Sequence, residues 1–257
     1  MPGDCGSDER IFSNFVFSIA VCSIFHVMEK VKKIRFLLAC VPFLRMVAVC
    51  NNHAFGIANE KSDIDLFVVT KKGRMFTARA FLTLLLHIFR MRRHGDKISG
   101  RFCLSFFIDE KALNLVEIAI KKDIYLAYWT KKLIPIVGGK VVDDFEMKNK
   151  WICGILGCSD FKINRGLMRG RSVIGMIFEI ILWPVSGLLE WGLRKWQIKR
   201  ALKKAKKLED KSGTIISKHM LKFHGGDKRV LYRDLYGNGK FDEPRFLATL
   251  KEFRAML

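Results

Sequence analysis

Residues 47–70, VAVCNNHAFGIANEKSDIDLFVVT, decide the fold. The stretch begins with a short apolar run, passes through polar residues, and becomes apolar again at 66–69. Side chains alternate between the two faces of a β-strand, so Asp63 and Asp65 are expected on one face and the apolar residues between and after them on the other. The pattern predicts two strands joined by a polar turn, with two carboxylates where the second strand begins.

Neighbouring carboxylates on one face of a strand repel each other unless a positive charge lies between them. Mg²⁺ often supplies that charge, because it prefers oxygen ligands and is held by one or two carboxylates together with substrate phosphates. Asp63 and Asp65 are therefore predicted as magnesium ligands. An Asp-x-Asp triplet is also common at solvated strand ends, and the residues alone leave this alternative open.

The stretch resembles the signature of the DNA polymerase β-like nucleotidyltransferase superfamily, and the chain is similar to bacterial proteins of the minimal nucleotidyltransferase type. In that signature an apolar strand, a Gly-Ser or Gly-Gly turn opening a helix, and a spacer lead to Asp-hydrophobic-Asp on the next strand. Ten residues separate Asn52 from Asp63, a spacing that the family accepts. The similarity extends loosely from about Arg35 to about Trp151. Asn51-Asn52 replaces the family's Gly-Ser, and asparagine tolerates left-handed backbone conformations, so the turn is expected to persist.

This resemblance implies Mg²⁺-dependent transfer of a nucleoside monophosphate from a nucleoside triphosphate to an acceptor hydroxyl, with release of pyrophosphate. Asp63 and Asp65 would hold the metal, and Asn51 and Asn52 would line the phosphate-binding turn. The family also has a third carboxylate, on the neighbouring strand, which would deprotonate the acceptor. Asp109 is the candidate for that role.

The third carboxylate has alternatives in the sequence. Asp109 lies at the end of an expected strand over 101–108 rather than in its middle, and an Asp-Glu turn explains it equally well. Glu117, on a weaker expected strand over 115–120, is the other acid considered.

Basic residues follow the Asp63/Asp65 strand and precede an expected helix over 74–91. Lys71, Lys72, Arg74 and Arg79 cluster near its N-terminus, and one or two of them are predicted to reach the phosphates with help from the helix dipole. Lys71, Lys72 and Arg74 are the preferred candidates. A solvated basic face is the alternative.

Composition favours a polyanionic partner. Half of the 257 residues are hydrophobic, which is enough for a packed core, and the formal net charge is +21. Nucleic acid, an anionic membrane surface and nucleotide phosphates all match that charge. The seven cysteines lack Cys-x-x-Cys spacing and several lie in apolar runs, which indicates reduced core residues of a cytoplasmic protein.

The expected fold class is α/β (α+β): a small mixed sheet of nucleotidyltransferase type, flanked by helices, with a mostly helical C-terminal region. Three parts are expected: an N-terminal helix (1–34), a nucleotidyltransferase domain (35–150) and a basic helical region (151–257). A homo-oligomer is compatible with this organisation.

Two segments of the C-terminal region differ in character. Residues 173–189 are apolar but short for a bilayer span, contain Glu179 and have basic residues at both ends. No transmembrane span is expected, and the segment is predicted to cover a hydrophobic face of the domain or of a second copy. Residues 194–208 contain eight basic and no acidic side chains and are predicted to bind RNA or another polyanion, with a solvated face as the alternative.

Three functions remain compatible with the sequence. The first is a nucleotidyltransferase, favoured by the intact Asp63/Asp65 pair. The second is a catalytically inactive protein of the same fold that binds RNA or a protein partner, favoured by the missing Gly-Ser and the position of Asp109. The third is a membrane-associated protein, based on 173–189 and the basic helix. The sequence contains no Walker A loop, HExxH motif or dinucleotide fingerprint.

Overall fold

The structure, a computed structural model, describes residues 29–206, 210, 212–223, 227–237 and 240–255. Most of the expected N-terminal helix therefore lies outside the described residues, and its described part belongs to a helix over residues 29–39. Positions 207 and 208 of the basic segment also lie outside them.

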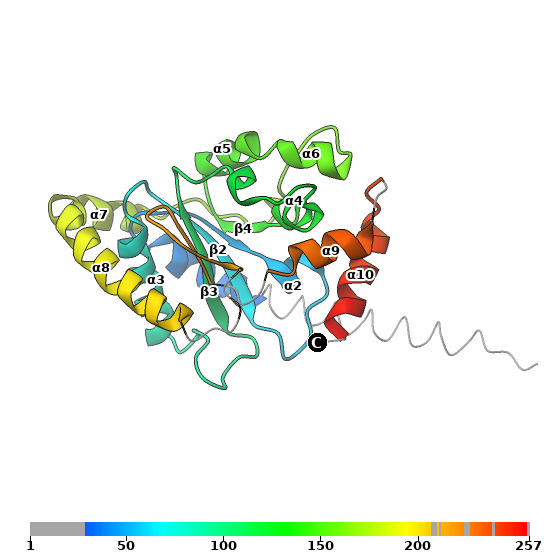
Figure 1. Ribbon diagram of the computed structural model, residues 1–257. Coiled ribbons are helices and arrows are strands. Elements are labelled where there is room, and N and C mark those ends of the chain that lie inside the picture. The colour runs from blue at the N-terminus through cyan, green and yellow to red at the C-terminus, as the bar shows by residue number, and fades with distance from the viewer. Residues whose placement is uncertain (1–28, 207–209, 211, 224–226, 238–239, 256–257) are drawn as a thin grey trace, which may run out of the picture.

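One six-stranded mixed sheet forms the centre of the molecule, in the order β4-β1-β2-β3-β6-β5 (Figure 1). Strands β2 and β3 pair in parallel, and all other neighbours are antiparallel. The sheet confirms the mixed α/β class that the sequence predicts. Its strands are β1 (Leu44–Val49), β2 (Ile64–Thr70), β3 (Phe102–Asp109), β4 (Ile134–Val137), β5 (Thr214–Ile216) and β6 (Met220–Phe223).

Alternating side chains of the central strands feed two hydrophobic cores, one on each face of the sheet. Leu66 and Val68 of β2 pack with the helix over 29–39 and with α3 (Met75–Ile88). Phe67 and Val69 pack on the other face, against a second group of helices. That group contains α4 (Ile124–Lys131), α5 (Lys140–Lys148), α6 (Trp151–Leu156), α9 (Arg229–Tyr236) and α10 (Glu243–Ala255).

The C-terminal part shares the sheet and the core of the part before it. Strands β5 and β6 extend the sheet beyond β3, and Tyr236 and Phe246 are buried in the same cluster as Phe67. The boundary expected near residue 150 thus falls between α5 and α6, inside one packed unit.

Two short elements differ from the expected ones. Residues 115–120 are not a strand: a 3₁₀ turn occupies Leu115–Ile118, because the Asn114 side chain accepts the N–H of Val116 and favours a turn there. Strand β4 was not predicted, because it has only four residues and one of them is Pro135. Proline is tolerated there because β4 lies at the edge of the sheet.

Helix α7 (Val173–Leu182), a 3₁₀ turn (Trp183–Val185) and α8 (Ser186–Ala205) together form a helical arm, residues 173–205. By length and composition the arm is apolar enough to cross a membrane, yet only 17% of its most apolar window is buried. The prediction that 173–189 covers a hydrophobic face of the domain is wrong, because the arm turns its polar side inward. Its alternative, a face of a second copy, stays a prediction. Its buried residues are Gly175, Glu179, Ser186, Glu190, Gln197 and Ala201.

Charged groups of the domain explain this inverted orientation. Glu179 lies 2.7 Å from Nη2 of Arg45 and 3.0 Å from Nζ of Lys71, and it also pairs with Arg171. Burial opposes ionisation of Glu179, but these hydrogen bonds lower its pKa to about 2. The carboxylate is therefore held charged between three cations, and it fixes α7 to the sheet.

Helix α8 is fixed to the beginning of α3 in a similar way. Glu190 accepts the backbone N–H groups of Phe76 and Thr77 at 3.1 and 2.8 Å. Gln197 donates to the Phe76 carbonyl at 2.8 Å. The two bonds to Glu190 satisfy free N–H groups in the first turn of α3, which has no acidic residue of its own there.

The fit of α7 against the domain is testable at Gly175. A Cβ at this position would lie 2.7 Å from the Ala39 carbonyl oxygen, so Gly175→Ala requires a backbone shift and should lower the free energy of unfolding by about 1–3 kcal/mol. Gly192 on the exposed side of α8 has open space around its Cα, so Gly192→Ala should stabilise by about 0.5–1 kcal/mol through helix propensity. Urea denaturation of both variants measures the difference, and equal effects would show that α7 does not pack as described.

Candidate functional site

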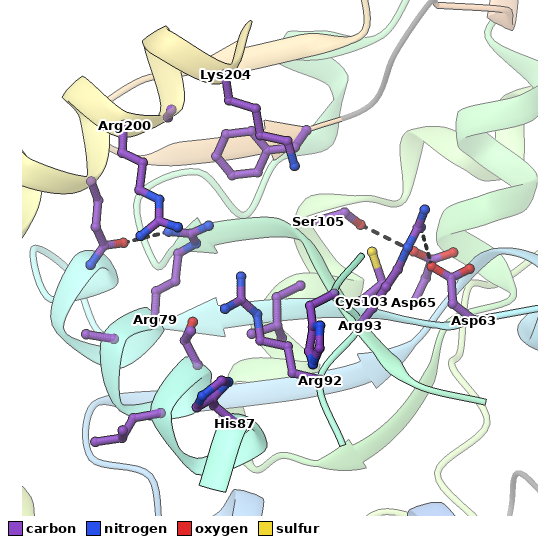
Figure 2. A pocket seen from close by; sticks show the side chains of 18 of the residues that line it. Asp63, Asp65, Arg79, His87, Arg92, Arg93, Cys103, Ser105, Arg200 and Lys204 are labelled. Atoms are coloured by element: carbon purple, nitrogen blue, oxygen red, sulfur yellow. Dashed lines mark hydrogen bonds and ion pairs between the residues drawn. The ribbon is translucent and has the colours of Figure 1, made fainter. Parts of the chain in front are cut away.

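Asp63 and Asp65 lie at the beginning of β2 and, as the sequence predicts, on the same side of the strand (Figure 2). Cys103 of β3 pairs directly with Asp65 across the parallel ladder. One ligand atom from each of the three residues lies within 4.8 Å of the others, so the group could hold a metal ion. The structure thus brings the two predicted magnesium ligands together and adds a cysteine.

Asn51 holds Asp65 in place. Its backbone is left-handed, with φ of 55°, as expected for an asparagine in the turn position. Its side-chain amide donates to Asp65 at 2.8 Å and accepts from the indole N–H of Trp129 at 2.7 Å. Asn51 therefore contacts the carboxylate pair and lines the adjoining cavity, whereas Asn52, the next residue of α2 (Asn51–Phe55), does not line it.

The carboxylate pair is electrostatically unfavourable. Burial and the charge of Asp63 raise the pKa of Asp65 to about 6, although the Asn51 hydrogen bond opposes the rise. Nη1 of Arg93 lies 2.6 Å from Asp63 and balances one of the two negative charges. Burial, together with Asp65 and Asp63, raises the pKa of the Cys103 thiol to about 12, so the thiol is protonated at neutral pH. Two carboxylates beside a neutral thiol suit a hard cation such as Mg²⁺.

The pair opens onto a cavity of about 1010 Å³ between β3, α3 and α8. Asp63 and Asp65 lie at one side of this cavity, and Arg79, Arg92 and Arg200 extend into it from the other (Figure 2). Lys204 of α8 also lines it, with His87 of α3. A divalent cation site and a set of cationic side chains therefore share one cavity.

The ion pairs of the described residues leave these arginines of the cavity out. Among the described residues, no carboxylate forms an ion pair with Arg79, Arg92 or Arg200. Burial, followed by the charges of Arg92 and Arg200, lowers the pKa of Arg79 to about 10. Burial and Arg200 also lower the pKa of Arg92. Such a group of cations attracts an anion with several negative charges.

An irregularity in β3 opens the cavity beside the acids. Between the pairs Asp65–Cys103 and Phe67–Phe106 the register shifts, so β3 has one residue more than β2 at this point. Strand β6 pairs with β3 only from Phe106 to Ile108. Cys103 and Ser105 are therefore left to line the cavity, and Ser105 Oγ lies 3.4 Å from Asp65.

Asp109 does not join this site. Because β2 and β3 run in the same direction, Asp109 pairs with Thr70 at the opposite end of the strands, about 20 Å from Cys103. Its buried carboxylate accepts the N–H groups of Gly73 and Lys111 and contacts Nδ1 of His219 at 2.8 Å. Asp109 thus organises a turn, which is the alternative reading of the sequence, and Glu117 is exposed on the 3₁₀ turn.

The three basic residues predicted to contact phosphates also lie at that far end. Lys71 pairs with Glu179, Arg74 donates to Ser186, and the backbone N–H of Lys72 is bonded to Glu110. They follow directly after Thr70, the last residue of β2, whereas Asp63 and Asp65 lie where β2 begins. These residues fix the helical arm and the loop before α3, and none of them lines the cavity.

Arg92 and Arg200 were not predicted as site residues, whereas Arg79 belonged to the basic cluster expected near the phosphates. The sequence has basic residues within 90–97 and 194–208, but no local pattern joins either segment to Asp63 and Asp65. A weak signal existed in Arg79, whose polar side chain lies within the apolar pattern of α3.

Comparison with protein-family models, curated proteins and solved structures found no match for this chain. The functional argument therefore depends on the geometry of the cavity.

The repulsion at Asp65 gives a pH-dependent stability. A pKa of about 6 in the folded protein exceeds the unfolded value of 3.8, so the folded state binds the proton more tightly and loses stability as pH rises from 3.8 to 6. Asp65→Asn removes the charge, and at pH 7.5 without metal it should raise the free energy of unfolding by about 1–3 kcal/mol.

The gain in Asp65→Asn should disappear near pH 4, where the wild-type carboxyl is mostly protonated. Asp96→Asn, at an exposed position, serves as the control and should change stability by less than about 0.5 kcal/mol at both pH values. Denaturant unfolding at pH 4 and 7.5 measures the effect, and a loss of stability in Asp65→Asn at pH 7.5 would show that the pair is structural.

Proposed function

We propose that the cavity binds a nucleoside triphosphate with a divalent cation, and that the protein transfers the nucleoside monophosphate to an acceptor hydroxyl. One observation carries the proposal: two adjacent carboxylates face the same cavity as three arginines that pair with no carboxylate in the described part of the chain. A triphosphate complexed with Mg²⁺ matches both groups of side chains: the metal requires oxygen ligands, which the carboxylates supply, and the phosphates require cations, which the arginines supply. The resemblance of residues 47–70 to the nucleotidyltransferase signature supports the same reading.

The side chains have separate roles in this proposal. Asp63 and Asp65 hold the cation, and Asn51 orients Asp65 through the hydrogen bond at 2.8 Å. Arg79, Arg92 and Arg200 bind phosphate oxygens and stabilise the charge of the pyrophosphate as it leaves. A bound Mg²⁺ would neutralise triphosphate charge and stabilise the attacking and leaving oxygens.

Nucleotide binding should depend on α8 in a position-specific way. Arg200→Gln removes a cation from the cavity and should weaken binding of a non-hydrolysable triphosphate with Mg²⁺ about tenfold, the effect of losing one charge-assisted hydrogen bond. Lys199→Gln, one residue away on α8 and outside the cavity lining, should leave the affinity unchanged. Calorimetric titration measures both, and equal losses would indicate only a general effect of net charge.

Metal dependence and catalysis are tested together. At about 100 times its Kd, the Mg²⁺–triphosphate complex should stabilise the folded state by about 2.7 kcal/mol, a Tm rise of about 5–10 °C. Asp65→Asn should abolish that rise. Transfer is measured with α-labelled nucleoside triphosphates and an RNA 3′ hydroxyl or protein hydroxyls as acceptors. Absence of stabilisation by every Mg²⁺–triphosphate complex would refute the proposal.

A second candidate function is nucleotide or RNA binding without catalysis. The observation that favours it is the position opposite Asp65, where β3 presents Cys103 and not an acid. Among the described residues that line the cavity, Asp63 and Asp65 are the only carboxylates. This candidate expects stabilisation by Mg²⁺–triphosphate with no transferred label, and it expects transfer to emerge in Cys103→Asp.

A further inference from the structure

The outward side of the helical arm exposes an unusual number of large apolar side chains. Ile180 and Leu188 are 73% and 74% exposed, the highest values among the large hydrophobic residues of the described chain. The set is densest from α7 to the first half of α8, where it includes Ile177, Phe178, Ile181, Trp183, Val185 and Trp191. Soluble monomers rarely leave so many apolar side chains together in water, so this surface requires a covering partner.

The arm lies at one edge of the molecule, where α7 and α8 lie outside α3 (Figure 1). Its inner side is already occupied by polar contacts, of which those of Glu179 and Glu190 are the strongest. Rotating the arm to bury its apolar side would break the ion pairs of Glu179 with its neighbouring cations. It would also remove Glu190 from the backbone N–H groups of α3. The apolar side is therefore fixed in the outward direction.

Two exposed tryptophans outside the cavity indicate the chemistry of the partner. Trp183 and Trp191 lie along the arm, each about half exposed. Each also has a cation near its ring: Lys71 Nζ lies 4.2 Å from the centroid of Trp183, and Lys195 Nζ lies 3.8 Å from that of Trp191. Tryptophan beside lysine or arginine is typical of the headgroup region of a bilayer, where the ring meets apolar chains and the cation meets phosphates.

Charge favours an anionic bilayer over a protein surface. The second half of α8 carries exposed Lys195, Lys199 and Lys203, within a segment, 194–208, that has no acidic residue. The whole chain carries a net charge of +21. A helix with an apolar side, interfacial tryptophans and neighbouring cations lies in the plane of a membrane surface and prefers anionic lipids.

We propose that the helical arm binds an anionic lipid bilayer in the plane of its surface, with the apolar side chains in the headgroup boundary and the sheet above them. The arm does not cross the bilayer in this arrangement, because Glu179 and Glu190 bind it to the domain along its length. The inference rests on the arm's own contacts and exposure, and it is independent of the function proposed for the cavity.

The test uses the full chain and two kinds of vesicle, one of phosphatidylcholine alone and one that also contains phosphatidylserine. The wild type should sediment with the phosphatidylserine vesicles, with a blue shift of tryptophan fluorescence. Ile180→Glu/Leu188→Glu places charges on the two most exposed apolar positions and should reduce the bound fraction at least about tenfold. Both positions are solvent-exposed, so the fold should persist in this variant.

Val116→Glu/Met147→Glu is the matched control, because it adds the same charge at exposed apolar positions on the 3₁₀ turn Leu115–Ile118 and on α5. It should bind vesicles as the wild type does. Lys195→Gln/Lys199→Gln/Lys203→Gln should remove the preference for phosphatidylserine and most of the salt dependence. None of these three lysines lines the cavity.

Several outcomes would overturn the inference. The first is wild-type protein that stays in the supernatant of the phosphatidylserine vesicles. The second is binding that persists in Ile180→Glu/Leu188→Glu, which would assign membrane contact to another segment. The third is a wild-type dimer, measured by light scattering, that this variant dissociates while vesicle binding is absent from both proteins. A second copy of the chain would then cover the arm.

Discussion

The parallel pairing of β2 with β3 is the constraint on which the arrangement of charges depends. Parallel neighbours need a crossover connection, and α3 supplies it. The same register places Asp65 opposite Cys103 at one end of the strands and Thr70 opposite Asp109 at the other. Acids at the first end face the cavity, whereas those at the second end organise turns. Helix α8, packed on α3, brings its cations to the first end.

Much of the fold was predictable because it follows from local patterns. Apolar alternation located β1, β2 and β3, and the Asp-x-Asp pattern placed both carboxylates on one side of β2. Asp109 was chosen for its residue type, although it lies six positions after Cys103 on β3 and so at the far end of the strand from Asp65. A strand position determines which end of the sheet a side chain reaches, and that information was present in the sequence.

The helical arm was harder to predict for a physical reason. Hydropathy alone predicts that the apolar side of a helix faces the domain, and the opposite is true here because the polar side has specific partners. Those partners, Arg45 and Lys71, are separated from Glu179 by more than a hundred residues. The arginines of the cavity are likewise joined to Asp63 only by tertiary packing. No periodicity reveals contacts of this kind.

The inward polar side of the arm has a consequence for how the sequence can vary. In most surface helices, buried positions accept only apolar residues and exposed positions accept almost any. Here the buried positions are held by hydrogen-bond geometry, so Glu190 cannot be exchanged for an apolar residue of equal size without orphaning the N–H groups of Phe76 and Thr77. If the outward side has a partner, its apolar character is constrained as well. Both sides of this helix would then resist substitution, which leaves little room for neutral drift along its length.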